Sequence, residues 1–467
     1  MRHARERGPR GAGRRDDGPR RGHLRHQRQG RLKLPGLFGL VLAGAFAATS
    51  PVLGAAAAPP PPPPAAHDQA EDFDTFWHAL DEGYAYFGAE HGAWKAAREK
   101  WRPKAVNAPT RSDFVAALEG ALGELRDDHL RLSERSAHSA RRVPYETDVW
   151  ARWKDGVAYV EAVRPFGDAD IAGLRPGLVV SAVDGISIEQ AVRERLDGGI
   201  ANARCRDWAL RHVLAGPRTG TQRITMIDGG QEKHLVLDRT EPHPGGAPVF
   251  GRRMGDERDI GYLRVRFGVD NAKVVDRFDA VLNYLDDTRA LIIDIRDPPG
   301  PGDRDVTQAL LARFATAEAA WQIHEPGPPG RKVDVVAPRG KAYRGPVLVL
   351  VDHWTAGESE SLAAGLRAVA GARIVGTRMA GLRGELGEAR LPHSGIVLRY
   401  PAHRTLLMNG EPREKMVPDV TIDLAAPQGG PGDPILYAAL KLLEPCPGPA
   451  CRSAPGSPPP ARASLPR

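Results

Sequence analysis

The chain has 467 residues, with 65 Lys or Arg against 58 Asp or Glu, and its formal net charge is +7. This length allows roughly two to four domains. A hydrophobic fraction of 41% excludes a wholly disordered chain, and only three cysteines exclude a disulfide-based scaffold. A basic protein raises the question of nucleic-acid or membrane binding, and the answer depends on where the charges lie.

The positive excess lies at the N-terminus. Residues 1–34 carry twelve Arg or Lys against three acidic residues, a balance of +9, which leaves −2 for the rest. An apolar run at 37–48 and small residues at 52–58 follow, which is the order of a secretory signal peptide. We therefore expect residues 1–58 to be a signal peptide with a basic leader, and the protein to be exported to the periplasm or secreted.

Two alternatives compete for this leader. A nucleic-acid-binding arm leaves the apolar run unexplained, so no nucleic-acid partner is expected. A retained membrane anchor is possible because residues 34–58 are uncharged and long enough to span a bilayer. Gly and Pro interruptions favour cleavage, so membrane contact is expected only through an uncleaved leader.

Two low-complexity segments flank the folded part. Residues 59–67 contain six consecutive prolines and predict a stiff linker. Residues 446–467 are rich in Pro, Ser and Gly and predict a disordered tail. Cys446 and Cys451 could pair in an oxidising compartment, which would leave Cys205 free.

Residues 68–140 carry a helical pattern. Phe73, Trp77, Leu80 and Tyr84 recur at spacings of three and four and form one apolar stripe. A second helix is expected to begin near residue 112, with Ser112 as its N-cap.

The remaining folded sequence divides into two parts. Residues 141–240 read as a β domain, with strands at 157–160 and 178–183 and a short helix at 188–196. Residues 250–445 alternate between strands and helices, which predicts a layered α/β domain. Its strands are expected at 260–265, 291–295, 347–351, 372–375 and 396–400, and its helices at 274–285, 306–314 and 360–369.

One junction in the α/β domain suits catalysis. Residues 349–361 run from a strand through a turn into a helix, where backbone N–H groups can stabilise an oxyanion. Within this turn, Thr355 and Glu358 have the spacing of a capping box.

Three blocks carry a resemblance to a known family. The string Ala172-Gly173-Leu174-Arg175-Pro176-Gly177-Leu178-Val179-Val180, followed by Val183-Asp184-Gly185, resembles the centre of a bacterial PDZ domain. Together with the Asp294–Arg296 strand and the 352–376 block, it makes residues 70–425 resemble the C-terminal-processing (tail-specific) serine peptidases, including their tricorn-like branch. The resemblance implies a crotonase-like (ββα superhelix) core, an N-terminal helical segment and an inserted PDZ-like β domain.

The resemblance also implies site residues. His129, in the context Glu124-Leu125-Arg126-Asp127-Asp128-His129, matches the general base, and Glu414 matches an orienting glutamate. The backbone N–H groups of Gly302 and Glu358 match the oxyanion donors, although Pro301 stands where the family has a glycine. No metal or other cofactor is implied.

The nucleophile departs from the family pattern. The family serine lies three residues before an acidic residue, and counting back from Glu360 reaches Gly357, which has no side chain to attack a carbonyl. Ser359 is the alternative, as a displaced nucleophile, and its competing interpretation is ordinary hydrogen bonding at the start of a helix.

The PDZ-like string predicts peptide binding. PDZ domains add an extended peptide as a strand, and Val157, Tyr159, Gly173 and Leu174 are the expected contact residues. The competing interpretation is that the domain only packs against its neighbour.

Two functional hypotheses follow. The first is an exported serine-type peptidase that cleaves peptides or unfolded protein C-termini by acyl transfer. The second is an inactive homologue that binds peptides or a partner protein. The sequence leaves the oligomeric state and the substrate open.

Overall fold

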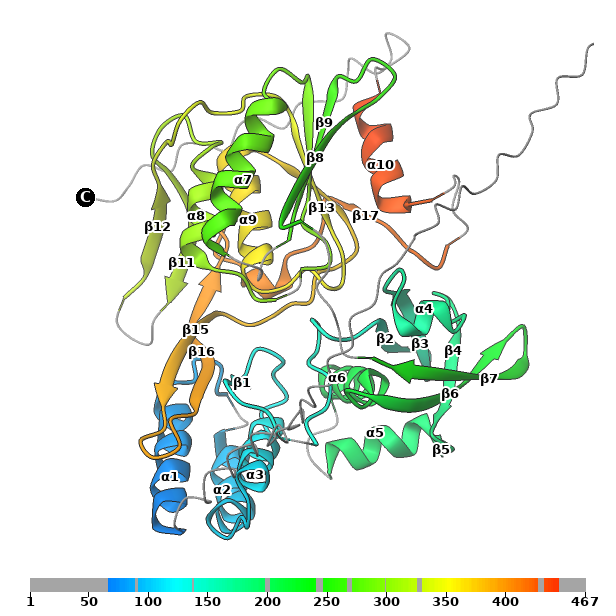
Figure 1. The fold of residues 1–467 in the computed structure, drawn as a ribbon, viewed down its shortest axis with the longest axis vertical. Coiled ribbons are helices and arrows are strands. Elements are labelled where there is room, and N and C mark those ends of the chain that lie inside the picture. The colour runs from blue at the N-terminus through cyan, green and yellow to red at the C-terminus, as the bar shows by residue number, and fades with distance from the viewer. Residues whose placement is uncertain are drawn as a thin grey trace, which may run out of the picture. The chain divides into compact units, whose positions relative to one another are not determined.

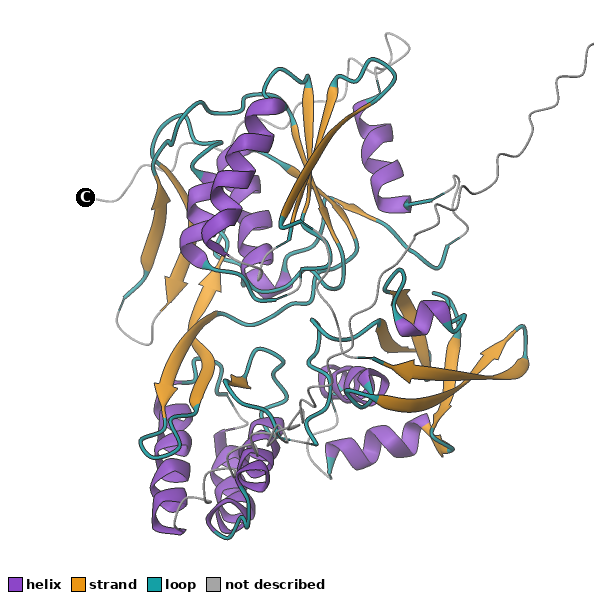
Figure 2. Cartoon of the chain, viewed as in Figure 1, coloured by secondary structure: helices purple, strands orange, loops and turns teal. Residues whose placement is uncertain are grey.

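The structure is a computed structural model, and its described residues lie within one compact unit, residues 61–467. The leader, the polyproline segment and the tail with Cys446 and Cys451 lie outside the described residues. Figures 1 and 2 show the elements in space. The described ranges are 66–88, 91–136, 138–197, 202–240, 247–266, 271–298, 300–325, 330–426 and 432–444.

The N-terminal part is helical. It contains α1 (Ala66–Gly83), α2 (His91–Val106) and α3 (Arg111–Gly123). The predicted stripe on α1 is confirmed, because Phe73, Trp77 and Leu80 are buried in one cluster with α2 and α3. The N-cap of α3 is Thr110, whose hydroxyl accepts the Asp113 N–H, so the prediction of Ser112 as the cap is wrong. The helix α2 had not been singled out in the sequence.

A six-stranded sheet follows, which we call the middle sheet. Its order is β2-β3-β4-β6-β7, with the short β5 paired to β4. The predicted helix at 188–196 is α5, and the predicted strands correspond to β3 and β4. The elements are β2 (Val149–Lys154), β3 (Val157–Val163), α4 (Asp168–Ile171), β4 (Val179–Val183), β5 (Ile186–Ser187), α5 (Ile188–Leu196), α6 (Ala203–Ala215), β6 (Gly220–Asp228) and β7 (Gln231–Arg239).

The α/β domain is built on a second six-stranded sheet. Its order is β17-β14-β13-β10-β9-β8, and all neighbours are parallel except β8 and β9. Predicted strands at 260–265 and 347–351 match β9 and β13 to the residue. The elements are β8 (Val249–Met254), β9 (Ile260–Val265), α7 (Asn271–Tyr284), β10 (Ala290–Asp294), α8 (Arg304–Leu311), β13 (Val347–Val351), α9 (Glu358–Ala370), β14 (Arg373–Gly376), β17 (Val420–Thr421) and α10 (Pro434–Leu443).

Helices cover both faces of this sheet (Figure 1). Alternate strand residues, such as Ile293 and Val349, pack against α7, α8 and α9. The intervening residues, such as Ile292 and Leu350, pack against α10. Burial on both faces explains why these strands are continuous apolar runs in the sequence.

A third sheet connects the α/β domain to the helical part. Its order is β1-β16-β11-β12, and β15 also pairs with β16. Leu398 of β16 is buried together with α1–α3, so this long strand reaches the helical part. The elements are β1 (Arg131–Leu132), β11 (Ala319–Glu325), β12 (Lys332–Val336), β15 (Glu385–Arg390), β16 (Val397–Leu406) and the 3-10 helix η1 (Arg413–Lys415).

The polar residues at the end of β10 have a structural role. Asp294 accepts hydrogen bonds from Tyr262 and Arg296, and Arg296 also reaches Asp433, the N-cap of α10. This ion-pair chain fixes α10 against the sheet. None of the helices in the described ranges combines the length and the apolarity that a membrane span needs.

The middle sheet touches the α/β domain close to the strand–turn–helix junction. The ring of Trp150 stacks on that of His353, with centroids 5.2 Å apart. Arg164 forms an ion pair with Asp297 and lies over the ring of Trp354. These contacts hold the turn after β13 against the middle sheet.

Candidate functional site

The turn after β13 leads directly into α9. The carboxylate of Asp352 accepts the N–H groups of Trp354 and Thr355, at 3.0 and 2.8 Å. The hydroxyl of Thr355 lies within the turn, 3.0 Å from the Asp352 carboxylate, so the capping box predicted between Thr355 and Glu358 is wrong. The N-cap is Gly357, and α9 begins at Glu358.

Gly357 adopts a conformation that requires glycine or strain. Its φ is 61° and its ψ is −125°, a region that L-residues rarely occupy. A sharp strand-to-helix turn of this kind is where nucleophile elbows place a serine. A Cβ atom at this position would lie 2.7 Å from the Pro301 carbonyl oxygen and 2.9 Å from the Tyr145 hydroxyl. The turn therefore keeps the shape of a nucleophile site but has no space for the side chain.

Glu360 stabilises this turn from inside the protein. Its carboxylate accepts the N–H groups of Gly357, Gly381 and Leu382, at 3.1, 2.9 and 3.2 Å. Burial raises the pKa of Glu360 to about 7, and Arg413 opposes the shift. Glu360 thus caps α9 and holds the loop that follows β14. It is also the acidic residue from which the nucleophile position was counted in the sequence.

The expected oxyanion donor at Glu358 is already occupied. Its N–H donates to the Pro301 carbonyl at 2.8 Å. Gly302, the other expected donor, follows with a φ of 82°. A substrate oxyanion would have to displace the Pro301 carbonyl to reach the Glu358 N–H, so the hole is closed.

His129 is held as a neutral ring of fixed orientation. It is 4% exposed, and its Nδ1 lies 2.5 Å from the Arg383 carbonyl oxygen. Since a carbonyl can only accept, Nδ1 carries the proton and Nε2 keeps its lone pair. Burial lowers the pKa of His129 to about 3, so the ring is neutral at pH 7.

Ser359 is hydrogen-bonded to no base among the described residues. Its side chain is fully buried on α9, and its hydroxyl has no hydrogen-bond partner among the described residues. In particular, no hydrogen bond joins it to His129, whose recorded partners are Arg383 and Asp127. This burial does not suit a nucleophile.

Glu414 lies in η1 and is not hydrogen-bonded to His129. One of its carboxylate oxygens is buried without a partner in the described part of the chain. Its neighbour Arg413 points inward and donates to the Ser361 hydroxyl and to the carbonyls of Leu382 and Gly384. The strongest contacts of this segment are therefore made by an arginine that sequence reasoning passed over.

The residues expected to bind a peptide are not grouped in a groove. Val157 and Tyr159 lie on β3, which is paired on both sides with β2 and β4, so no strand can add there. Leu174 is fully buried in the core of the middle sheet, so its side chain is not open to a peptide. Gly173 has open space around it, with a φ of 99°.

The free edge of the middle sheet at β2 is covered. The carboxylate of Asp207 on α6 accepts the Trp153 N–H at 2.8 Å, as a neighbouring strand would. The guanidinium of Arg206 lies over the ring of Trp153, and that of Arg211 over the ring of Trp150. Helix α6 thus occupies the edge that a PDZ-type ligand would use.

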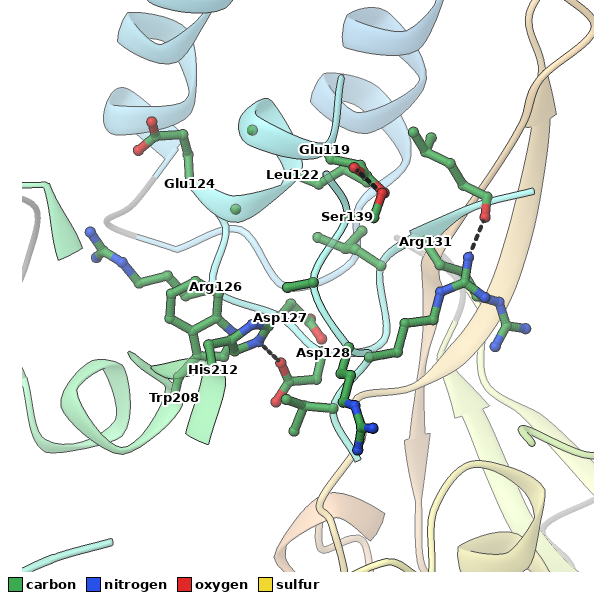
Figure 3. A pocket seen from close by; sticks show the side chains of 18 of the residues that line it. Glu119, Leu122, Glu124, Arg126, Asp127, Asp128, Arg131, Ser139, Trp208 and His212 are labelled. Atoms are coloured by element: carbon green, nitrogen blue, oxygen red, sulfur yellow. Dashed lines mark hydrogen bonds and ion pairs between the residues drawn. The ribbon is translucent and has the colours of Figure 1, made fainter. Parts of the chain in front are cut away.

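A cavity of about 620 Å³ lies beside the Gly357 turn. Figure 3 shows that its wall includes residues of the loop after α3 and of α6. Pro301 and Tyr145, the two residues that crowd position 357, also line it. Across the described ranges, no group of three or more His, Cys, Asp or Glu could hold a metal ion.

Comparison with known proteins identifies the α/β domain. The model of the peptidase family S41 matches residues 259–422. These residues belong to peptidase family S41. The family resemblance found in the sequence is therefore confirmed for the domain that carries Gly357 and Ser359, and no curated protein matches the chain.

Solved structures show a similar fold. Mature CPAF is 16% identical with a TM-score of 0.52 and covers 76% of this chain and 92% of its own. CPAF complexed with lactacystin is 16% identical with a TM-score of 0.51, and the match covers 76% of this chain and 94% of that chain. A photosystem II D1 C-terminal processing protease is 19% identical with a TM-score of 0.49, and the match covers 76% of this chain and 93% of that chain. At these identities the likeness to CPAF shows the fold alone.

Some parts of the S41 site could not be found from the sequence. The Arg383 carbonyl that orients His129 is a backbone group 254 residues away along the chain. Tyr145 and the Pro301 carbonyl are recognised only by their approach to Gly357. From the sequence, Pro301 was notable only because proline lacks an N–H. In the structure its carbonyl also accepts the Glu358 N–H and crowds position 357.

Proposed function

We propose that this chain is a peptide-binding member of peptidase family S41 that does not hydrolyse peptides by serine acyl transfer. One observation supports the proposal: at Gly357, the position that the family pattern gives to the nucleophile, the Pro301 carbonyl would lie 2.7 Å from a Cβ atom and accepts the Glu358 N–H. The chain thus lacks a nucleophile and has a closed oxyanion site.

The size of these losses favours inactivity. Loss of a catalytic serine costs about 10⁶ in turnover. Loss of one oxyanion donor costs a further 10²–10³, roughly. Ser359 does not compensate, because its hydroxyl is buried and has no base beside it.

Several features support peptide binding. The α/β domain is proposed to be a crotonase-like core, and the middle sheet a PDZ-like domain. A cavity of about 620 Å³, lined in part by the Tyr145 and Pro301 that crowd Gly357, is within the size range of ligand sites. The basic and apolar leader of residues 1–58 supports export, so the expected ligands are peptides or unfolded proteins outside the cytoplasm.

The test combines cleavage and binding. Purified full chain is incubated with unfolded casein, and fragments are followed by mass spectrometry, alongside the Ser359→Ala and His129→Ala variants. We expect no fragments above the level of the His129→Ala variant, and concentration-dependent binding of labelled casein by fluorescence anisotropy. Cleavage that disappears in Ser359→Ala would overturn the proposal.

His129 is the observation that favours the alternative, an active hydrolase. Its Nε2 has no hydrogen-bond partner among the described residues and is unprotonated at pH 7, although a pKa of about 3 makes the ring a weak base. The same assay decides, because casein cleavage that survives Ser359→Ala but not His129→Ala would assign hydrolysis to a base-activated water.

A further inference from the structure

The cavity beside the Gly357 turn is lined by acidic and basic side chains that differ in the partners they have. Each acidic side chain that lines it has a hydrogen-bond partner, although the partners of Glu119 and Glu194 are uncharged and leave those negative charges in place. The pairs are Glu119 with Ser139, Glu124 and Asp197 with Lys100, Asp127 with Tyr84, Asp128 with His212, Glu146 with Arg135, and Glu194 with Gln190.

Three arginines of the lining have no carboxylate partner in the described part of the chain. Arg142 donates to the Leu132 carbonyl at 3.1 Å, and Arg195 lies over the ring of Trp208. Arg131 has no recorded side-chain hydrogen bond, and its Nε is buried without a partner. In the described part of the chain, no ion pair therefore neutralises these three guanidinium groups, although the lining as a whole holds as many acidic as basic side chains or more.

Arg131 and Arg142 lie close enough to repel each other. Burial lowers the pKa of Arg131, and the charges of Arg399 and Arg142 lower it further, while Tyr145 and Glu388 oppose the shift. Gathering like charges in a partly buried place is unfavourable unless an anion joins them. An arginine fork binds a carboxylate through two parallel hydrogen bonds, which suits this arrangement.

The cavity also connects these arginines to the S41 turn. Tyr145 lines the cavity and has a buried hydroxyl with no recorded partner, only 2.9 Å from where a Cβ of residue 357 would be. Gly300 and Pro301 complete the same wall. The cavity that holds these arginines therefore extends to the two residues that crowd Gly357.

We propose that Arg131, assisted by Arg142, binds a carboxylate of the peptide that this S41 protein holds. This inference rests on the proposed peptide-binding function and assigns the anchor to the cavity rather than to the covered β2 edge. The carboxylate can be the C-terminus of the peptide or an acidic side chain, and the test separates the two.

The experiment measures anisotropy of a fluorescein-labelled peptide of Ala, Gly and Leu on the full chain. Three forms are used: a free C-terminus, a C-terminal amide, and the amide with Asp as its last residue. Arg131→Gln is expected to weaken binding of the free-acid peptide by about 10- to 100-fold, since a hydrogen bond to a charged group contributes about 1.5–3 kcal/mol. Amidation should weaken binding to the parent chain similarly, and to Arg131→Gln no further.

Controls separate this role from a folding effect. Arg131→Lys should retain part of the preference for the free acid, and the exposed Arg331→Gln should bind like the parent chain. Recovery of affinity by the Asp-containing amide identifies an acidic side chain as the ligand; no recovery identifies the C-terminus. Equal affinity for acid and amide would overturn the carboxylate site alone, whereas binding of neither peptide would overturn the proposed function and the site with it.

Discussion

The His129 end and the Gly357 end of the candidate site differ in which features expected of a catalytic site are present. At the His129 end, the neutral ring, its orientation and its free Nε2 are all present. At the Gly357 end, the turn and its cap are present, but the side chain is absent and the Pro301 carbonyl fills the approach.

The difference teaches that side chains with structural contacts are present, whereas a side chain that would act only in catalysis is absent. His129 is buried and bonded to the Arg383 carbonyl, so it joins the helical part to the loop that follows β14. Glu360 likewise holds three backbone N–H groups. A serine at position 357 would have only a chemical role, and its loss leaves these contacts intact.

The largest effect is expected from rebuilding the Gly357 end. Gly357→Ser alone should be inactive and destabilised by about 1–3 kcal/mol, because the positive φ and the Pro301 carbonyl both oppose a side chain. Adding Pro301→Gly frees the loop to turn its carbonyl away. The double variant should cleave casein at least about 10³ times faster than the parent chain.

The control for this gain is a third substitution, His129→Ala, which should abolish it. A double variant that folds normally but cleaves no faster than the parent chain would show that the His129 end is no longer a base.

The next largest effect is expected on the free energy of unfolding when the pH is lowered through the titration of His129. Burial lowers the pKa of His129 from its ordinary value of 6.5 to about 3 in the folded protein, so folding favours the neutral ring. The stability from this group is present above pH 6.5 and is lost as pH falls toward 3, by about 4 kcal/mol. His129→Gln should flatten that part of the curve of unfolding free energy against pH, measured in urea. An unchanged slope would contradict it.

The third effect concerns Glu360, which supports both ends. Glu360→Ala leaves three buried N–H groups without an acceptor, and should lower the free energy of unfolding by about 3 kcal/mol. Glu360→Gln, which keeps the shape and one acceptor, should cost less. Glu388→Ala, at an exposed carboxylate, is the control and should change stability little. Equal losses for Ala and Gln would contradict the hydrogen-bond explanation.

The smallest effect lies in the ion network next to Glu358. Burial lowers the pKa of His324, but its contacts with Asp334 and Glu385 outweigh this and raise it to about 9. The stability from this group is complete below pH 6.5 and is lost as pH rises through 9, by about 2–3 kcal/mol. Thermal unfolding of His324→Gln should show less decline between pH 7 and pH 10 than the parent chain. An identical decline would contradict this assignment.

Much of the α/β domain could be predicted because each strand is a buried apolar run. The 347–351 strand and the 260–265 strand have the expected bounds, since both faces of their sheet are covered. Strands such as β12 were missed because they are short and half exposed. Helix α2 was missed because Pro103 and several charges weaken its pattern.

The site was less predictable, for a physical reason. Spacing along the chain identified position 357 and His129, because motifs record local order. It could not show that the Pro301 carbonyl contacts position 357, that Arg413 occupies the interior near Ser361, or that α6 covers β2. These contacts join distant segments and involve backbone atoms, which carry no sequence signature.

The crowding between positions 357 and 301 also limits how the protein can change. A serine introduced first meets the carbonyl, and a glycine introduced first at 301 loosens the loop that satisfies the Glu358 N–H. Each single step is therefore worse than the starting point, although the pair is expected to be better. A library of single substitutions will not recover hydrolysis from this chain, and a selection for activity has to begin from paired changes.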